Sequence, residues 1–225
     1  MNKKPNIDES WYELLKDEFE KQYFIEIKQK LDTDINEWIK VYPKIENIYA
    51  AFNKTPFDKV KVIILWQDPY HSEWQAQWFC FSVPDWMKLP PSLQNIYKEL
   101  NRSIWLDIPK SWDLTHWTIE WVFLLNAILT VQAGNPASHA KIWWERFTDT
   151  VIKTISDNKD WVIFMLWWAF AQSKKSLIDT SKHYVLETTH PSPFSAHRWF
   201  LWSDCFKQTN EILIKNWKTP INWQI

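Results

Sequence analysis

Apolar and polar positions follow one another along this chain in blocks that predict strands and helices in turn. Four short, continuous apolar runs have the length and composition of strands that are covered on both faces. These runs are residues 60–66, 121–129, 161–167 and 183–189. Around and between them, apolar residues recur at the spacing of amphipathic helices. The predicted helices are residues 8–40, 92–102, 142–158, 171–179 and 205–216.

Strands that alternate with helices form a parallel sheet through right-handed crossovers. We therefore expect an α/β fold, a single-domain three-layer sandwich with a central, mostly parallel four-stranded sheet flanked by helices. No internal repeat, low-complexity stretch or linker divides the chain, so residues 1–225 are expected to form one domain. A length of 225 residues also suffices for a substantial core.

Polar residues gather where the predicted strands end. The segments are residues 67–71, Asn126, residues 168–172 and residues 190–198. Ligands of parallel α/β sheets bind beyond the carboxyl ends of the strands. Because each of these segments follows or closes a predicted strand, they are expected to converge on one site.

Taken one at a time, these residues leave structural and chemical roles open. Asp68, held by Pro69, suits a general base or a stabiliser of positive charge, although capping its own loop is the commoner role. Asn126 interrupts an apolar strand and either reads a ligand or bridges structure. His190 opens a turn restricted by prolines, where a hydrogen-bonded loop histidine is the commoner outcome.

Charge and spacing weigh against several classes of protein. The net charge of −1 gives no overall sign of nucleic-acid binding. His71, His190 and His197 lack the spacing of zinc enzymes, and neither a metal nor a cofactor is expected. A Ser-His-Asp hydrolase built from Ser192, His190 and Asp68 is a competing class. However, the G-x-S-x-G elbow of such enzymes is absent, and Ser192 lies between two prolines. Without an apolar run that could span a bilayer, a cytoplasmic protein is expected.

Glycine is almost missing from the chain. At the usual roughly 7%, a chain of this length would carry about 16 glycines. It carries 1 glycine and 19 tryptophans. Trp66, Trp74 and Trp78 fall in or beside the polar loop after the first predicted strand, where tight bends usually need glycine.

Several motifs, in this order, resemble family 1 uracil-DNA glycosylases. They are "QDPYH" (67–71), "LPPSLQNIYKEL" (89–100), "LLNAILTV" (124–131), "SHA" (138–140) with "WERFTD" (144–149), "VIFMLW" (162–167) and "HPSPFSAHR" (190–198). The resemblance extends from about residue 41 to the C-terminal "KTPINW". It implies a monofunctional DNA repair enzyme that hydrolyses the N-glycosidic bond of uracil in DNA, the first step of base-excision repair. The target nucleotide must be flipped out of the stack.

The resemblance also implies roles for the residues that do the chemistry. Asp68 would stabilise the positively charged sugar and orient the attacking water. His190, in its neutral form, would hydrogen-bond uracil O2 as negative charge develops there. Both are candidate catalytic residues, and no cofactor is implied.

Four further residues are implied to bind the base. Phe81 would stack on uracil, and Gln67 would line the same pocket. Asn126 would accept from uracil N3–H and donate to O4, a pattern that cytosine reverses. Tyr70 would stand against C5 and exclude the methyl group of thymine.

Three loops are implied to hold single- or double-stranded uracil-containing DNA, through Ser92, Ala169, Ser192 and Phe194. Ala169 stands where relatives have a serine, and Phe194 stands where they usually have a leucine wedge that fills the vacated stack. Ser72, Glu73 and Gln77 also depart from the family pattern. A monomer is expected, with a DNA-mimicking inhibitor protein as a candidate partner. The alternative is a catalytically inactive homologue that acts as a DNA- or protein-binding module.

Many family glycines are replaced by tryptophan in this chain. The positions are Trp66, Trp74, Trp78, Trp121, Trp143, Trp168, Trp199 and Trp202, with Trp38, Trp86, Trp105, Trp112, Trp161 and Trp217 as further members. Family tryptophans instead match Trp11, Trp117, Trp144, Trp167 and Trp223. Our hypothesis is that the source reads the codon UGA as glycine, whereas the translation used a table that reads it as tryptophan.

Overall fold

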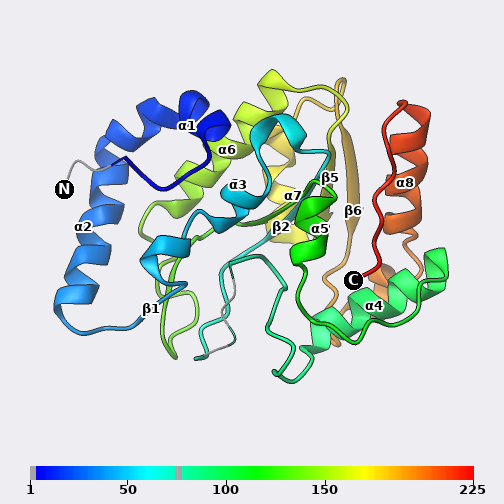
Figure 1. Ribbon diagram of the computed structural model, residues 1–225, viewed down its shortest axis with the longest axis horizontal. Coiled ribbons are helices and arrows are strands. Elements are labelled where there is room, and N and C mark those ends of the chain that lie inside the picture. Colours follow the sequence, from blue (N-terminus) through cyan, green and yellow to red (C-terminus); the bar gives the residue numbers. More distant parts are fainter. Residues whose placement is uncertain (1–3, 74, 76–77) are drawn as a thin grey trace.

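A four-stranded parallel sheet forms the centre of the molecule in the computed structural model, which describes residues 4–73, 75 and 78–225 (Figure 1). The strand order is β3-β2-β5-β6. These strands are β2 (Val62–Trp66), β3 (Val122–Asn126), β5 (Ile163–Trp167) and β6 (Tyr184–Thr188). Each falls within one of the predicted apolar runs, so the α/β class and the four-stranded parallel sheet are confirmed. Trp74 and Gln77 lie outside the described residues.

Helices flank the sheet, with α1, α2 and α6 toward one side of the view and α4 and α8 toward the other (Figure 1). The helices are α1 (Glu9–Leu15), α2 (Gln22–Asn36), α3 (Ala50–Lys54), α4 (Pro91–Ile104), α5 (Thr115–Ile119), α6 (Trp144–Asn158), α7 (Ala169–Ser173) and α8 (Cys205–Lys215). Among the helices of the described residues, none is long and apolar enough to cross a membrane.

Some predicted elements are divided, and some were missed. The single helix expected over residues 8–40 is wrong, because a 3₁₀ turn over Lys16–Glu20 and the extended backbone of Lys21 separate α1 from α2. The helix expected over 171–179 begins earlier as α7 and continues as 3₁₀ turns. A two-residue antiparallel pair, β1 (Val41–Tyr42) with β4 (Val131–Gln132), was not predicted.

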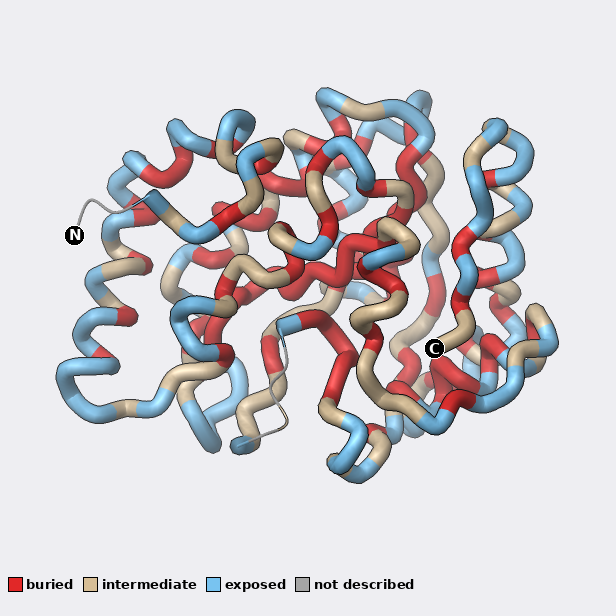
Figure 2. The backbone as a smooth tube through the Cα atoms, viewed as in Figure 1, coloured by how far each residue is buried: buried red, intermediate tan, exposed pale blue. Residues whose placement is uncertain are grey.

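The register of the sheet aligns the carboxyl ends of β2 and its edge-strand neighbour β3. Trp66, the last residue of β2, pairs with Asn126, the last residue of β3. All residues of β3 and β5 are buried, as expected for strands that helices cover on both faces. Buried residues run through the centre of the chain trace (Figure 2). The polar segments that follow the strands therefore emerge at one edge of a rigid core.

Five tryptophans belong to this core. They are Trp11, Trp117, Trp144, Trp167 and Trp223, each at most 1% exposed. Three of their indole N–H groups are hydrogen-bonded, for example that of Trp11 to the backbone oxygen of Thr55 at 2.8 Å. These five are the positions where the resemblance expects tryptophan.

Candidate active site

Hydrogen bonds connect the segments that follow the strands at the carboxyl edge of the sheet. The backbone oxygen of Gln67 accepts from the N–H of Ile128 at 2.8 Å, which joins the segments after β2 and β3. The amide nitrogen of Gln172, on α7, donates to the backbone oxygen of Thr188 at 2.8 Å, which joins α7 to the end of β6. The predicted site residues on these segments consequently share one framework.

Asp68 lies on the loop that follows β2, and its Oδ2 accepts a hydrogen bond from the backbone N–H of Ala137 at 3.0 Å. Burial raises the pKa of the Asp68 carboxyl, while this N–H and nearby His71 act in the opposite direction. Sequence reasoning missed Ala137, because its contribution comes from the backbone; its only signal was its place next to the "SHA" motif.

His190 follows β6 and is held in a defined tautomer. Its Nδ1 accepts a hydrogen bond from the backbone N–H of Ser192 at 2.8 Å. A neutral imidazole that accepts at Nδ1 carries its proton on Nε2. Burial lowers the pKa of His190 to about 4, so the ring is neutral at neutral pH. His190 therefore presents an uncharged Nε2–H donor.

Asn126 closes β3 with its side chain only 6% exposed. Its Oδ1 has no hydrogen-bond partner among the described residues. Leaving a buried amide oxygen without a partner costs about 1–3 kcal/mol, so such an atom calls for an explanation. A ligand that donates a hydrogen bond at this point would supply one.

Aromatic side chains surround these polar groups. Phe81 is buried, and its ring centroid lies 5.4 Å from that of Trp167. Tyr70 is half-buried on the loop after β2, and burial raises its pKa, so the phenol stays protonated. These rings offer the flat, apolar walls that suit a nucleobase.

Two tryptophans that stand where the resemblance expects glycine, Trp66 and Trp168, lie among these side chains. The ring centroid of Trp66 lies 4.0 Å from that of Phe81 and 4.6 Å from that of His190. The indole of Trp168 stacks on His190, with centroids 4.3 Å apart and planes at 15°. A base that touched both Phe81 and His190 would have to occupy the place of these indoles.

The loops predicted to hold DNA lie at the starts of helices and in the turn after β6. Ser92 is in the first turn of α4, and exposed Ala169 begins α7. In the turn after β6, the Oγ of Ser192 lies 3.1 Å from that of Ser195, and Phe194 is 87% exposed.

A side chain on α4 connects two of these loops. The amide nitrogen of Asn95 donates to the backbone oxygen of Pro191 at 2.8 Å. This bond fixes the start of α4 against the turn that carries His190 and Ser192. Sequence reasoning did not single out Asn95, because an asparagine within an amphipathic helix gives no signal of such a contact.

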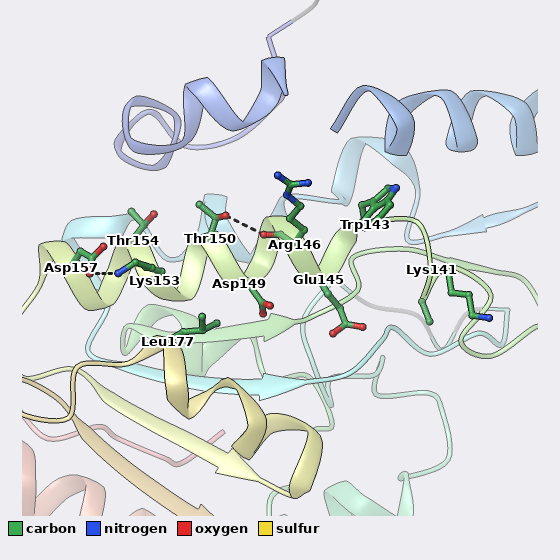
Figure 3. Close-up of a pocket in the computed structure, with 11 residues that line it drawn as sticks. Lys141, Trp143, Glu145, Arg146, Asp149, Thr150, Lys153, Thr154, Asp157 and Leu177 are labelled. Atoms are coloured by element: carbon green, nitrogen blue, oxygen red, sulfur yellow. Dashed lines mark hydrogen bonds and ion pairs between the residues drawn. The ribbon is translucent and has the colours of Figure 1, made fainter. Parts of the chain in front are cut away.

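A hollow with a volume of about 870 Å³ lies elsewhere, along α6 (Figure 3). None of the ten predicted site residues lines it. Each of its carboxylates has a cationic partner, since Lys174 bridges Glu145 and Asp149, and Lys153 bonds Asp157 at 2.9 Å. Among the described residues, no group of His, Cys, Asp and Glu is arranged to hold a metal ion.

Comparisons with known proteins agree on one family. A family model described as the uracil DNA glycosylase superfamily matches residues 52–214. The uracil-DNA glycosylase of Azotobacter vinelandii is 48% identical over 219 residues, which cover 97% of this chain and 94% of that protein. The uracil-DNA glycosylase of Borrelia duttonii is 50% identical over 222 residues, covering 97% and 98%.

Solved structures lead to the same family. The crystal structure of mimivirus uracil-DNA glycosylase superposes with a TM-score of 0.93 at 30% identity, covering 97% of this chain and 88% of that one. A mimivirus UNG variant in complex with UGI matches with the same TM-score and covers 89% of that chain. The similarity therefore extends over nearly the whole fold.

Proposed function

Because the chain belongs to the uracil DNA glycosylase superfamily, we propose that it excises uracil from DNA. The reaction is hydrolysis of the N-glycosidic bond, the first step of base-excision repair, on a nucleotide flipped out of the stack. The observation that carries the proposal is the meeting, at one sheet edge, of a carboxylate, a neutral histidine donor and an unpartnered buried amide oxygen.

Asp68 acts on the sugar side of the bond. As the bond breaks, positive charge develops on the deoxyribose, and a carboxylate beside it stabilises that charge. The same carboxylate orients the water that attacks the sugar carbon. The N–H of Ala137 occupies Oδ2 at 3.0 Å, which holds the carboxyl group in a fixed orientation.

His190 acts on the base side of the bond. Uracil leaves as an anion, and the Nε2–H of a neutral ring stabilises charge on its O2. A cationic ring would hold the anion through charge, but the lowered pKa of about 4 keeps this ring neutral. The N–H of Ser192 on Nδ1 fixes which nitrogen carries the proton.

Asn126, Tyr70 and Phe81 select the base. The free Oδ1 of Asn126 accepts from uracil N3–H, whereas cytosine presents an acceptor at that position. A site that leaves a buried acceptor without a donor rejects the wrong base strongly. Tyr70 blocks the methyl group of thymine, Phe81 stacks on the ring, and Gln67 lines the same pocket.

DNA is held by the exposed loops around the pocket. Ser92 and Ser192 bind phosphates, which sets register without reading sequence. Ala169 contributes its backbone beside them. Phe194, 87% exposed, inserts into the space that the flipped nucleotide leaves.

Substitution of the two catalytic residues tests this function. Asp68→Asn and His190→Leu should each lower uracil release by about 100-fold or more, because each removes a group that acts in the transition state. Both substitutions are made in a chain that carries glycine at the positions where the resemblance expects it. Release is measured from a uracil-containing oligonucleotide, with circular dichroism as the control for folding. Near-unchanged rates in both folded variants would contradict the assignment and leave the binding-module alternative.

The proposal extends to organisation and partners. One continuous cluster of buried apolar residues, from Ile7 to Trp223, supports a single domain over residues 1–225. We propose that this domain acts as a monomer. The similar mimivirus variant in complex with UGI supports an inhibitor protein that mimics DNA as a further partner.

A further inference from the structure

Backbone angles set eight tryptophans of the described residues apart from the five core tryptophans. These eight have φ between 56° and 145°, the region that glycine favours. They are Trp38, Trp105, Trp121, Trp143, Trp161, Trp168, Trp202 and Trp217. The five core tryptophans all have ordinary backbone angles. Every left-handed tryptophan thus belongs to the group that the resemblance assigns to glycine.

Helix ends show the pattern most clearly. After α2, Trp38 N–H donates to Ile35 and Ile39 N–H donates to Asp34, at 3.0 and 2.8 Å. This is the Schellman arrangement, whose left-handed residue is usually glycine. Here that residue is Trp38, with φ 61° and 94% of its surface exposed.

The end of α8 repeats this arrangement. Trp217 N–H donates to Ile214 and Lys218 N–H donates to Leu213, at 3.0 and 2.9 Å. Trp217 has φ 56° and is 98% exposed. An indole that makes so little contact cannot explain why a tryptophan occupies the residue that ends the helix.

Trp168 has a backbone conformation typical of glycine within the candidate active site. Its φ of 145° and ψ of 172° lie in a region that only glycine adopts without strain. Its indole nitrogen is buried and has no partner among the described residues. The ring stacks on His190 and lies 4.5 Å from the ring of Trp66, which itself contacts Phe81.

We propose that residues 66 and 168 control entry of the base, and that the active protein has glycine at both positions. Glycine at 168 relieves the backbone strain at that position. Glycine at both positions removes the two indoles that lie against Phe81 and His190. The other seven left-handed tryptophans are glycine in the same protein, through UGA codons that the source reads as glycine. The role of the opened space as a uracil pocket rests on the proposed function.

A matched pair of chains tests the control of entry. Both carry glycine at the seven other left-handed positions, so that backbone strain outside the site is the same. The closed chain keeps Trp66 and Trp168, whereas the open chain carries Trp66→Gly and Trp168→Gly. Binding of free uracil is measured by calorimetry, and release of uracil is measured on a single-stranded oligonucleotide. Circular dichroism establishes that both chains fold.

The open chain is expected to bind uracil and to release it, at least 100-fold faster than the closed chain. Equal behaviour of the two chains in both measurements overturns the inference. If the open chain alone binds uracil but releases none, control of entry stands and the proposed function fails.

The gene and the natural protein test the identity of the residues. UGA codons at 66 and 168, with glycine in peptides of the natural protein by mass spectrometry, are the expected result. UGG codons at these positions, or tryptophan in those peptides, would overturn it.

Discussion

Burial shifts the pKa values of Asp68 and His190 in opposite directions. It raises the pKa of the Asp68 carboxyl and lowers the pKa of His190 to about 4, so both shifts favour the uncharged form. Ala137 opposes the shift of Asp68 by donating its N–H to the carboxylate. The shift of His190 comes from burial, so the ring remains a neutral donor.

These shifts predict the pH dependence of uracil release. Asp68 must be ionised, and its raised pKa means that activity declines as the pH falls toward that value, above the ordinary range of an aspartate. Burial also lowers the pKa of His190, so protonation of its ring causes no decline at neutral pH. Rates measured against pH for the open chain should therefore level off at neutral pH.

The Asp68→Asn variant provides the control for this profile. It removes the titrating carboxyl, so its slow residual release should lose the decline that Asp68 causes. An unchanged decline in that variant would assign the titration to another group.

Replacing Asn126 is expected to slow uracil release without destabilising the fold. Asn126→Leu replaces a buried amide, whose Oδ1 lacks a partner, by an apolar side chain of similar size. The free energy of unfolding is expected to stay the same or rise by about 1 kcal/mol, while uracil release falls sharply. Urea unfolding and release assays check the two effects. A clear loss of stability would mean that Asn126 bridges structure, the alternative that its sequence left open.

At the ends of α2 and α8, glycine is expected to be more stable than the tryptophan that stands there. Trp38→Gly and Trp217→Gly should each raise the free energy of unfolding by about 1 kcal/mol, because a non-glycine residue pays roughly 1–2 kcal/mol in the left-handed region. Both positions are almost fully exposed, so little packing is lost. The measurement is urea unfolding of the single variants.

A core tryptophan serves as the contrast. Trp117 is buried, and its indole N–H donates to the backbone oxygen of Trp223 at 3.0 Å. Trp117→Gly should lower the free energy of unfolding by at least about 3 kcal/mol. Destabilisation by all three substitutions would contradict the division of the tryptophans into two groups.

The four sheet strands were predictable because a continuous apolar run that ends in polar residues is typical of buried parallel strands. Two short helices, α3 and α5, were missed because five residues span too few turns to establish a helical period. The break between α1 and α2 depends on the backbone of Lys21, which no side-chain pattern reveals. Ala137 was equally hidden, since its N–H, and not its methyl group, meets Asp68.

In the molecule as a whole, the parallel sheet gathers residues that are far apart along the chain. Asp68 follows β2, Asn126 ends β3 and His190 follows β6, yet all three lie at the carboxyl edge of one sheet. With a net charge of −1, the chain cannot rely on overall charge to hold DNA. Recognition therefore depends on the exposed loops that surround this edge.

Excision of uracil at this edge of the sheet is tested most directly by one measurement. The open chain is incubated with single-stranded oligonucleotides that carry uracil, thymine or cytosine at one position, and the free base is quantified. We predict release of uracil alone, and its loss in the Asp68→Asn variant of the same chain. Release of thymine or cytosine at a similar rate, or no release of uracil by the folded chain, would contradict the account.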